Sequence, residues 1–167
     1  SIEVKMDPRL NVDEAALKKR DEMYDAYMKK ASLVVKAMER LNEADETVKL
    51  VSGRLKDRKD KDSRALQKQG KEIAQRIKKI NEAFSGRRDV QGIRRDPNTI
   101  TSKTFMAMRY IQGALDMPGS TEEAVLKQAH TAIDEATEMV NKFFAEDWKT
   151  YTEAVDAANV SLFKSYE

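Results

Sequence analysis

The sequence has no cysteine and a single histidine, His130, among its 167 residues. Without cysteine there is no disulfide, no thiolate metal ligand and no cysteine nucleophile. Because the usual nitrogen and sulfur ligands of transition metals are missing, we expect no tightly bound metal and no cofactor. His130 follows Lys127 by three residues, so the Glu-x-x-His pair of di-iron bundles is absent as well. We expect His130 to be a surface or boundary residue of a helix.

Proline and glycine are also scarce, with three and six residues. No stretch approaches the roughly 18 uncharged apolar residues of a membrane span, so we expect none. Charged residues make up 36% of the chain and apolar residues 40%, a balance typical of long helices. The length corresponds to one domain.

A long helix is predicted over residues 12–55, which contain no proline and one glycine. At about 1.5 Å per residue it would be roughly 65 Å long, so partners of similar length are needed. Asp45 and Ser52 interrupt its apolar row, and we expect Asp45 to pair with a cation of a neighbouring helix or with solvent. The row alternates three- and four-residue spacings and comprises Tyr24, Tyr27, Ala31, Val34, Met38, Leu41, Val48 and Leu55.

Three further helices are predicted from the same spacing. The second follows a cap at Ser63, has Gly70 at a row position and is ended by Gly86. The third follows a cap at Thr101 or Ser102, and the last runs from Ser120 to about Lys164 with a kink near Trp148. Their rows are Leu66, Ile73, Ile77, Ile80 and Phe84, then Phe105, Met108, Ile111 and Leu115, then Leu126, Ala129, Ile133, Ala136, Val140 and Phe143. The predicted fold is an all-α, antiparallel up-down four-helix bundle over residues 11–167, with long first and last helices and two shorter ones.

The first ten residues have a different pattern. Ile2-Glu3-Val4-Lys5 alternates apolar and charged residues as a strand does, and Asp7-Pro8-Arg9 forms a stiff junction after it. Nothing later in the sequence offers a strand for it to pair with. We therefore predict that residues 1–10 are an extended junction to an upstream β-domain, and that the chain is a C-terminal piece of a larger protein.

The charge is distributed unevenly along the chain. Residues 1–100 hold 25 Lys and Arg against 18 Asp and Glu, a net +7, and residues 101–167 hold 6 against 11, a net −5. One interpretation places basic early helices beside acidic late ones inside the bundle. The other is a basic surface for an acidic partner.

Two basic turns and one aromatic are the candidate interaction residues. Arg87, Arg88, Arg94 and Arg95 cluster in one connection, and Lys56, Arg58, Lys59 and Lys61 in the other. Three aspartates are interleaved with the second group, and no aromatic is interleaved with either, as base stacking would require. This favours solvated turns over nucleic-acid binding. Trp148, where the apolar pattern breaks, is the candidate for docking another protein.

The order of these features resembles a known family. The chain begins with a strand followed by Asp7-Pro8-Arg9, then a long helix and an arginine-rich exit from the second helix. After these come Asp96-Pro97-Asn98 before a short helix that ends at Leu115, and finally Pro118-Gly119-Ser120-Thr121. This is similar to the C-terminal helical region of bacterial sortilin-like, BNR-repeat (Asp-box) β-propeller proteins labelled glycosyl hydrolases. The resemblance implies that any hydrolase activity belongs to an upstream propeller and that no catalytic residue lies in this chain.

Two functions remain open from the sequence. The resemblance implies a non-catalytic accessory module that packs on the propeller or mediates association, including homo-oligomerisation, exported with its parent to the periplasm or cell surface. The alternative is a phosphate- or nucleic-acid-binding module that uses the arginine-rich turns.

Overall fold

The structure is a computed structural model that describes residues 13–87, 96–114 and 118–160. In these ranges the chain is helical and contains no strand: α1 (Glu14–Leu55), α2 (Lys61–Ser85), α3 (Ile100–Gly113), α4 (Ser120–Phe143), a π-helical segment η1 (Phe144–Trp148) and α5 (Lys149–Ala157). The prediction of an all-α antiparallel bundle of four helices is confirmed, because α4, η1 and α5 form one continuous rod. Residues 1–12, with the predicted strand and junction, lie outside the described ranges, as does Leu115.

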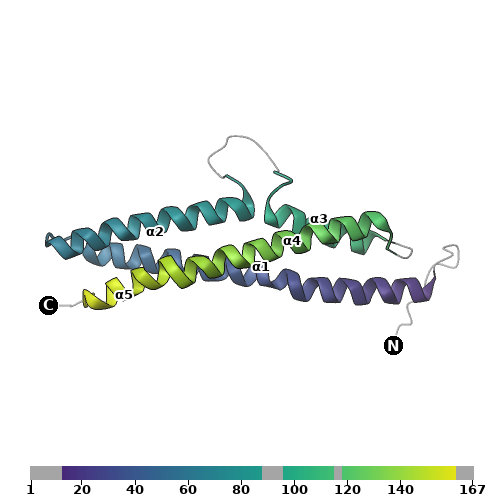
Figure 1. The fold of residues 1–167 in the computed structure, drawn as a ribbon, viewed down its shortest axis with the longest axis horizontal. Coiled ribbons are helices and arrows are strands. Elements are labelled where there is room, and N and C mark those ends of the chain that lie inside the picture. The colour runs from purple at the N-terminus through teal and green to yellow at the C-terminus, as the bar shows by residue number, and fades with distance from the viewer. Residues whose placement is uncertain (1–12, 88–95, 115–117, 161–167) are drawn as a thin grey trace, which may run out of the picture.

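The two short helices lie end to end along the first one. α2 returns from the far end of α1 to the middle of the bundle, and α3 continues in the same direction to the near end (Figure 1). α4 to α5 then runs back along the whole length. Any cross-section therefore contains three helices: α1, α2 and the last rod at one end, and α1, α3 and α4 at the other.

The buried face of α1 is wider than the predicted row. Leu41, Val48 and Leu55 are buried as expected. The structure also buries Ala37, Ala44 and Val51, whereas the predicted row positions Met38, Asp45 and Ser52, one residue further along, are half-buried. Three positions in each seven face the core because α1 packs against α4 as well as against α2 and α3, which a two-position row cannot cover.

Two helix starts differ from the prediction. α2 is capped by Asp60, whose carboxylate accepts from the Ser63 amide at 2.8 Å, and Ser63 itself is buried in the first turn. This hydrogen bond lowers the pKa of the Asp60 carboxyl. α3 is capped by Thr99, which accepts from the Ser102 amide at 3.2 Å. Ser63, Thr101 and Ser102 were thus the wrong caps, because an earlier side chain of equal capping ability reaches the free amides.

The last helix ends at Ala157 rather than near the predicted Lys164, because Asn159 leaves the helix with φ of 46°. The remaining boundaries agree more closely. Asp13 caps α1 by accepting from the Ala15 amide at 2.9 Å. Gly86 ends α2 with φ of 79°, a left-handed conformation that favours glycine. α4 begins at Ser120 as predicted, and the Glu122 carboxylate accepts from the Gly119 amide at 2.9 Å. Gly119, the cap, has no side chain, so only half of a capping box forms.

Candidate interaction surfaces

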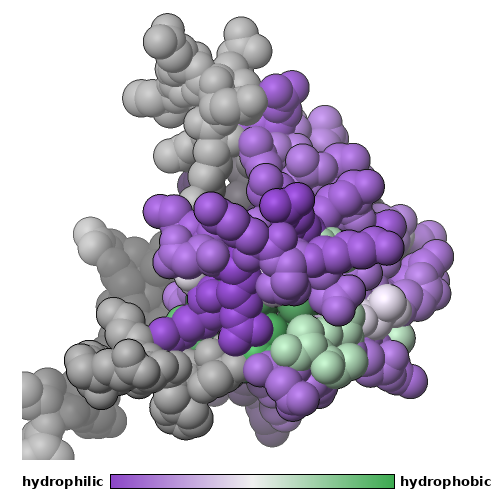
Figure 2. Space-filling view, turned by 90° about the vertical axis from the view of Figure 1, so that its left-hand side faces the viewer, coloured by the Kyte–Doolittle hydropathy of each residue, from purple (hydrophilic) through white to green (hydrophobic). Residues whose placement is uncertain are grey.

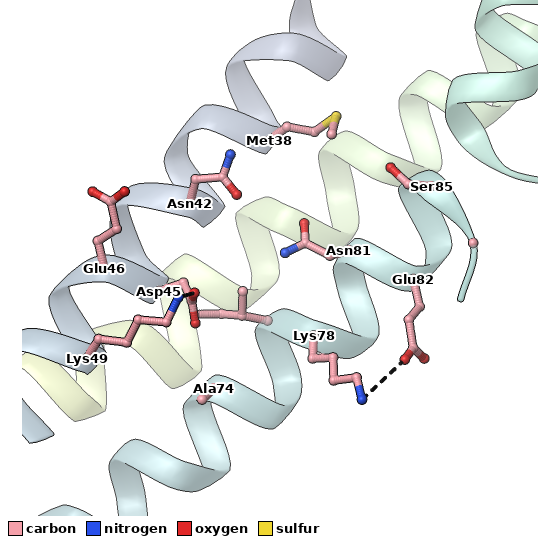
Figure 3. A pocket seen from close by; sticks show the side chains of 12 residues that line it. Met38, Asn42, Asp45, Glu46, Lys49, Ala74, Lys78, Asn81, Glu82 and Ser85 are labelled. Carbon is pink, nitrogen blue, oxygen red and sulfur yellow. Dashed lines mark ion pairs between the residues drawn. The ribbon is translucent and has the colours of Figure 1, made fainter. Parts of the chain in front are cut away.

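A groove of about 720 Å³ lies between α1 and α2 (Figure 3). Met38 from α1 and Ala74 and Ile77 from α2 contribute apolar surface to it. Asn42 and Asn81 project into it from opposite sides. The other lining residues are Asp45, Glu46, Lys49, Lys78, Glu82, Ser85 and Gly86.

The charged side chains of this groove pair within their own helices. Lys49 contacts Asp45 at 2.6 Å, and Lys78 contacts Glu82 at 4.0 Å, in each case four residues apart. The Asp45 carboxylate raises the pKa of Lys49 by hydrogen bonding and by its charge. Asp45 thus pairs with its own helix rather than with a neighbouring one. The groove offers amides and balanced charge, which can hold a polar chain but provides no nucleophile with an adjacent base.

The outward face of α3 carries the second candidate surface. Phe105 is 52% exposed, Met106 45% and Tyr110 41%. The Arg109 guanidinium lies 6.0 Å from the Phe105 ring centre. We call these four residues the α3 patch. Phe, Met, Tyr and Arg are the residue types enriched at the centres of protein–protein interfaces.

The α3 patch corrects the predicted inward row. Phe105 was expected to face the core with Met108 and Ile111, but the buried residues of α3 are Ile100, Ala107 and Ile111, and Met108 is half-buried. Both rows have helical spacing. The signal that sequence reasoning missed is the row formed by Ile100, Thr104, Ala107 and Ile111, whose small members allow α3 to approach its neighbours closely.

A polar junction joins α1, α3 and α4 beneath this end of the bundle. The Tyr27 hydroxyl donates to the Thr104 carbonyl at 2.8 Å, and the Tyr27 ring stacks on His130 with centres 5.8 Å apart. His130 Nε2 is buried and has no hydrogen-bond partner among the described residues. Burial lowers the pKa of His130, and the nearby Lys30 ammonium lowers it further, whereas Asp134 raises it. His130 is thus the half-buried boundary residue that the sequence predicted.

Where the sequence predicted a kink, the structure has, within the continuous rod, the π-helical segment η1. Trp148, its last residue, is half-buried and lies 5.8 Å from the Tyr151 ring and 6.0 Å from the Phe144 ring, measured between ring centres. Phe143 joins this aromatic cluster, and the Arg40 guanidinium lies 4.1 Å from the Phe144 ring centre. Trp148 therefore packs within the bundle on aromatic neighbours, a position that gives it less free surface than the residues of the α3 patch.

Tyr151 also forms a close contact across three helices. Its side chain is 2% exposed, and its hydroxyl has no hydrogen-bond partner among the described residues. A Cβ placed on Gly70 would lie 3.2 Å from the Tyr151 hydroxyl and 3.4 Å from the Ser52 hydroxyl. Gly70 and Ser52, the two small residues that interrupt the apolar rows of α2 and α1, thus leave room for the Tyr151 ring.

The predicted arginine cluster falls mostly outside the described residues. Arg87 is described and exposed; Arg88, Arg94 and Arg95 lie in the segment that the structure does not describe. Within the described ranges, no three His, Asp or Glu side chains are grouped so as to hold a metal ion. No described helix is both long and apolar enough to cross a membrane.

Comparison of the chain with models of protein families, with curated proteins and with solved structures finds no match. The likeness to the helical regions that follow β-propellers therefore stays a prediction from the residues.

Proposed function

We propose that this chain is a non-catalytic interaction module that associates through the α3 patch. The observation that carries the proposal is the exposure of Phe105, Met106 and Tyr110 on one short helix, beside Arg109. Four side chains of the types that anchor protein interfaces, gathered on one face, mark a docking site better than scattered exposed residues do.

The proposed occupant is a domain that precedes the bundle in a larger parent chain. The Arg20 guanidinium donates to the Ala114 carbonyl at 3.1 Å, so the start of α1 lies beside the end of α3. Figure 1 places both at the same end of the bundle. The first turns of α1 therefore lie at the end of the bundle that carries the α3 patch.

The strand-like pattern of Ile2 to Lys5 supports a β-domain as that occupant. With the resemblance, the proposal becomes an accessory module of an exported bacterial β-propeller protein, at the periplasm or cell surface. In the groove between α1 and α2, both lysines pair with carboxylates of their own helices, which supports a binding role rather than a catalytic one for this chain.

Hydroxyl-radical footprinting tests the proposal, because methionine, phenylalanine and tyrosine side chains react in proportion to their exposure. This chain is compared with a longer one that includes the upstream domain. We expect strong protection of Phe105, Met106 and Tyr110 in the longer chain. Met139 on α4, 39% exposed, is the matched control and should react equally in both. Equal oxidation of the α3 patch in the two chains would refute the proposed occupant.

A further inference from the structure

α2 carries an outward row of cations along almost its whole length. The positions alternate three- and four-residue spacings, so they share one side of the helix, opposite the buried residues Leu66, Ile73 and Ile80. From the first to the last position the row extends about 27 Å. We call it the α2 basic row; at these spacings it comprises Lys61, Arg64, Lys68, Lys71 and Lys78, with Gln75 between the last two, and it includes the adjacent Lys79, all exposed.

The bundle leaves most of this row without counter-charge. Acidic residues of the last rod reach two cations of the early helices, with Asp134 pairing with Lys30 and Asp147 with Arg76, and neither cation belongs to the row. Within the row, Lys78 pairs with Glu82 at 4.0 Å. The other five cations form no ion pair with any residue in the described part of the chain. Pairing of basic and acidic helices inside the bundle thus explains only part of the charge asymmetry.

The row makes residues 54–79 basic, and the residues beside it are hydrophilic. Residues 54–79 hold 11 Lys and Arg against 4 Asp and Glu, a net charge of +7. Figure 2, which views the end of the bundle formed by the turn between α1 and α2, shows hydrophilic residues over most of that end. Electrostatic complementarity, rather than apolar burial, is therefore the interaction that this surface can offer.

The row also carries repulsion within α2. Arg64 follows Lys61 by three residues and precedes Lys68 by four, and Lys71 follows Lys68 by three. Like charges at these spacings destabilise a helix, and only Lys68 and Lys78 of the row have a glutamate four residues on, Glu72 and Glu82. Carboxylates of another molecule, bound along the row, would offset this repulsion.

We propose that the α2 basic row is a docking surface for an acidic helical segment of a partner protein, with carboxylates repeated every three or four residues. Asp60 and Asp62 stand at one end of the row and Glu82 at the other. These carboxylates bracket the row at the length of a short helix, and beyond Asp60 the turn carries Lys56, Arg58 and Lys59 interleaved with Asp57. A long polyanion such as a nucleic-acid duplex would run past both ends and meet these carboxylates. No aromatic side chain lies in the row for bases to stack on.

The probe is a labelled helical peptide of about 20 residues, which spans about 30 Å, with glutamate at alternating three- and four-residue intervals. Binding is measured by fluorescence anisotropy at about 10 mM and about 150 mM salt, where the Debye length is about 30 Å and about 8 Å. We expect saturable binding at the lower salt that weakens by about tenfold at the higher. The same peptide with glutamine for glutamate should not bind.

Two triple variants of equal net charge locate the surface. R64Q/K68Q/K71Q removes three cations of the row, and K18Q/K19Q/K29Q removes three exposed cations of α1. Circular dichroism checks that both remain helical. The row variant should lose about tenfold in affinity, and the α1 variant less than about twofold.

Several results would overturn the proposal. Equal weakening by both variants would show that overall charge, not the row, binds the peptide. A DNA duplex that binds more tightly than the peptide and loses affinity in the row variant would make the partner a nucleic acid. Self-association that disappears in the row variant would make it a second copy of this chain. Failure of the peptide to bind at about 10 mM salt would refute the proposed role of the row.

Discussion

The two ends of the bundle are built from the same three-helix cross-section but place their large side chains differently. At the α2 end, Leu41, Val48, Ile77 and Phe84 are buried, and the outside of α2 is charged. At the α3 end the core combines the large residues Tyr27 and Ile111 with more small ones, and Ala31, Ala107, Ala129 and Ala132 are all buried. The large residues Phe105, Met106 and Tyr110 of that end lie outside.

This difference separates stability from association. Burial of large aliphatic and aromatic side chains contributes about 1.5–3 kcal/mol each, so the α2 end holds the fold together more strongly. The α3 end buries Tyr27 and Ile111 but keeps Phe105, Met106 and Tyr110 available for another surface. The α2 end in turn offers charge on its outside, so the two proposed docking surfaces differ in chemistry as well as in position.

A matched pair of phenylalanines gives the largest expected effect. Phe84 on α2 is fully buried and Phe105 on α3 is 52% exposed. Phe84→Ala should lower the free energy of unfolding by about 3–5 kcal/mol because it removes a core ring and leaves a cavity. Phe105→Ala should change it by less than about 0.5 kcal/mol, as exposed substitutions do. Urea denaturation followed by circular dichroism measures both.

The pair discriminates between two placements of Phe105. If Phe105 lay in the core, as its helical spacing with Met108 and Ile111 suggested, its replacement would cost as much as that of Phe84. Similar losses for the two variants would therefore contradict the exposed α3 patch and the proposed function that rests on it.

The contact between Gly70 and Tyr151 provides the next effect, at the α2 end. Tyr151→Phe removes a buried hydroxyl that has no partner in the described part of the chain, and should stabilise the fold by about 1 kcal/mol. Gly70→Ala gains about 1 kcal/mol of helix propensity but brings a methyl group to 3.2 Å from that hydroxyl. We expect the propensity gain and the close contact to cancel in the parent chain. In the Tyr151→Phe background the propensity gain should appear in full.

Thermal unfolding of the four proteins in this double-mutant cycle measures the coupling. Gly70→Ala stabilising both backgrounds equally would show that the hydroxyl does not limit the approach of α2. The matched control is Gly53→Ala on α1, where an added Cβ meets no atom within 4 Å and only the propensity gain remains.

The sequence predicted the α2 end better than the α3 end for a physical reason. In α2, leucine, isoleucine and phenylalanine occupy the only apolar row with helical spacing, so hydrophobicity and geometry agree. In α3, the row through Phe105 is more hydrophobic than the row through Ala107, and both have helical spacing. Close approach of helices selects the alanine row, and that approach is a property of the packed bundle rather than of any segment.

For the candidate surfaces too, the sequence shows the pattern of residues but not the neighbours that they contact. The position of Gly70 in an apolar row was visible in the sequence, but its reason, the ring of Tyr151, comes from a segment 81 residues away. The charge asymmetry was also visible in the sequence, and the helical spacing of the α2 basic row can be read from it. Which cations pair across the bundle depends on helix neighbours, as Lys30 with Asp134 shows.

Acidification should weaken the α3 end in particular, through His130. Burial and Lys30 lower the pKa of His130 below its ordinary value of about 6.5. The unfolded chain then binds a proton at higher pH than the folded one, so stability is full above about pH 6.5 and falls as the pH drops through the folded pKa. Denaturation at several pH values from 8 to 5 should show this loss.

His130→Gln should remove this part of the pH dependence, because glutamine does not titrate. Asp134 opposes Lys30 at this site, so Lys30→Met should raise the pKa of His130 and reduce the loss between pH 6.5 and 5. An unchanged pH profile in the glutamine variant would assign the acid sensitivity to other groups.

The smallest effect tests whether the α2 basic row lowers the stability of its own helix. Arg64→Glu replaces repulsion from Lys61 and Lys68 by attraction, and places an acid near the positive N-terminal end of α2. Its new repulsion from Asp60 offsets part of this, so we expect a gain of about 0.5 kcal/mol in the free energy of unfolding. Lys29→Glu on α1 is the opposite control, since it sets an acid four residues after Asp25 and should destabilise by a similar amount. If the row serves binding, Arg64→Glu should raise the free energy of unfolding and also weaken binding of the acidic peptide. If Arg64→Glu instead destabilises the chain as Lys29→Glu does, the row contributes to folding, and its repulsion is no argument for a partner.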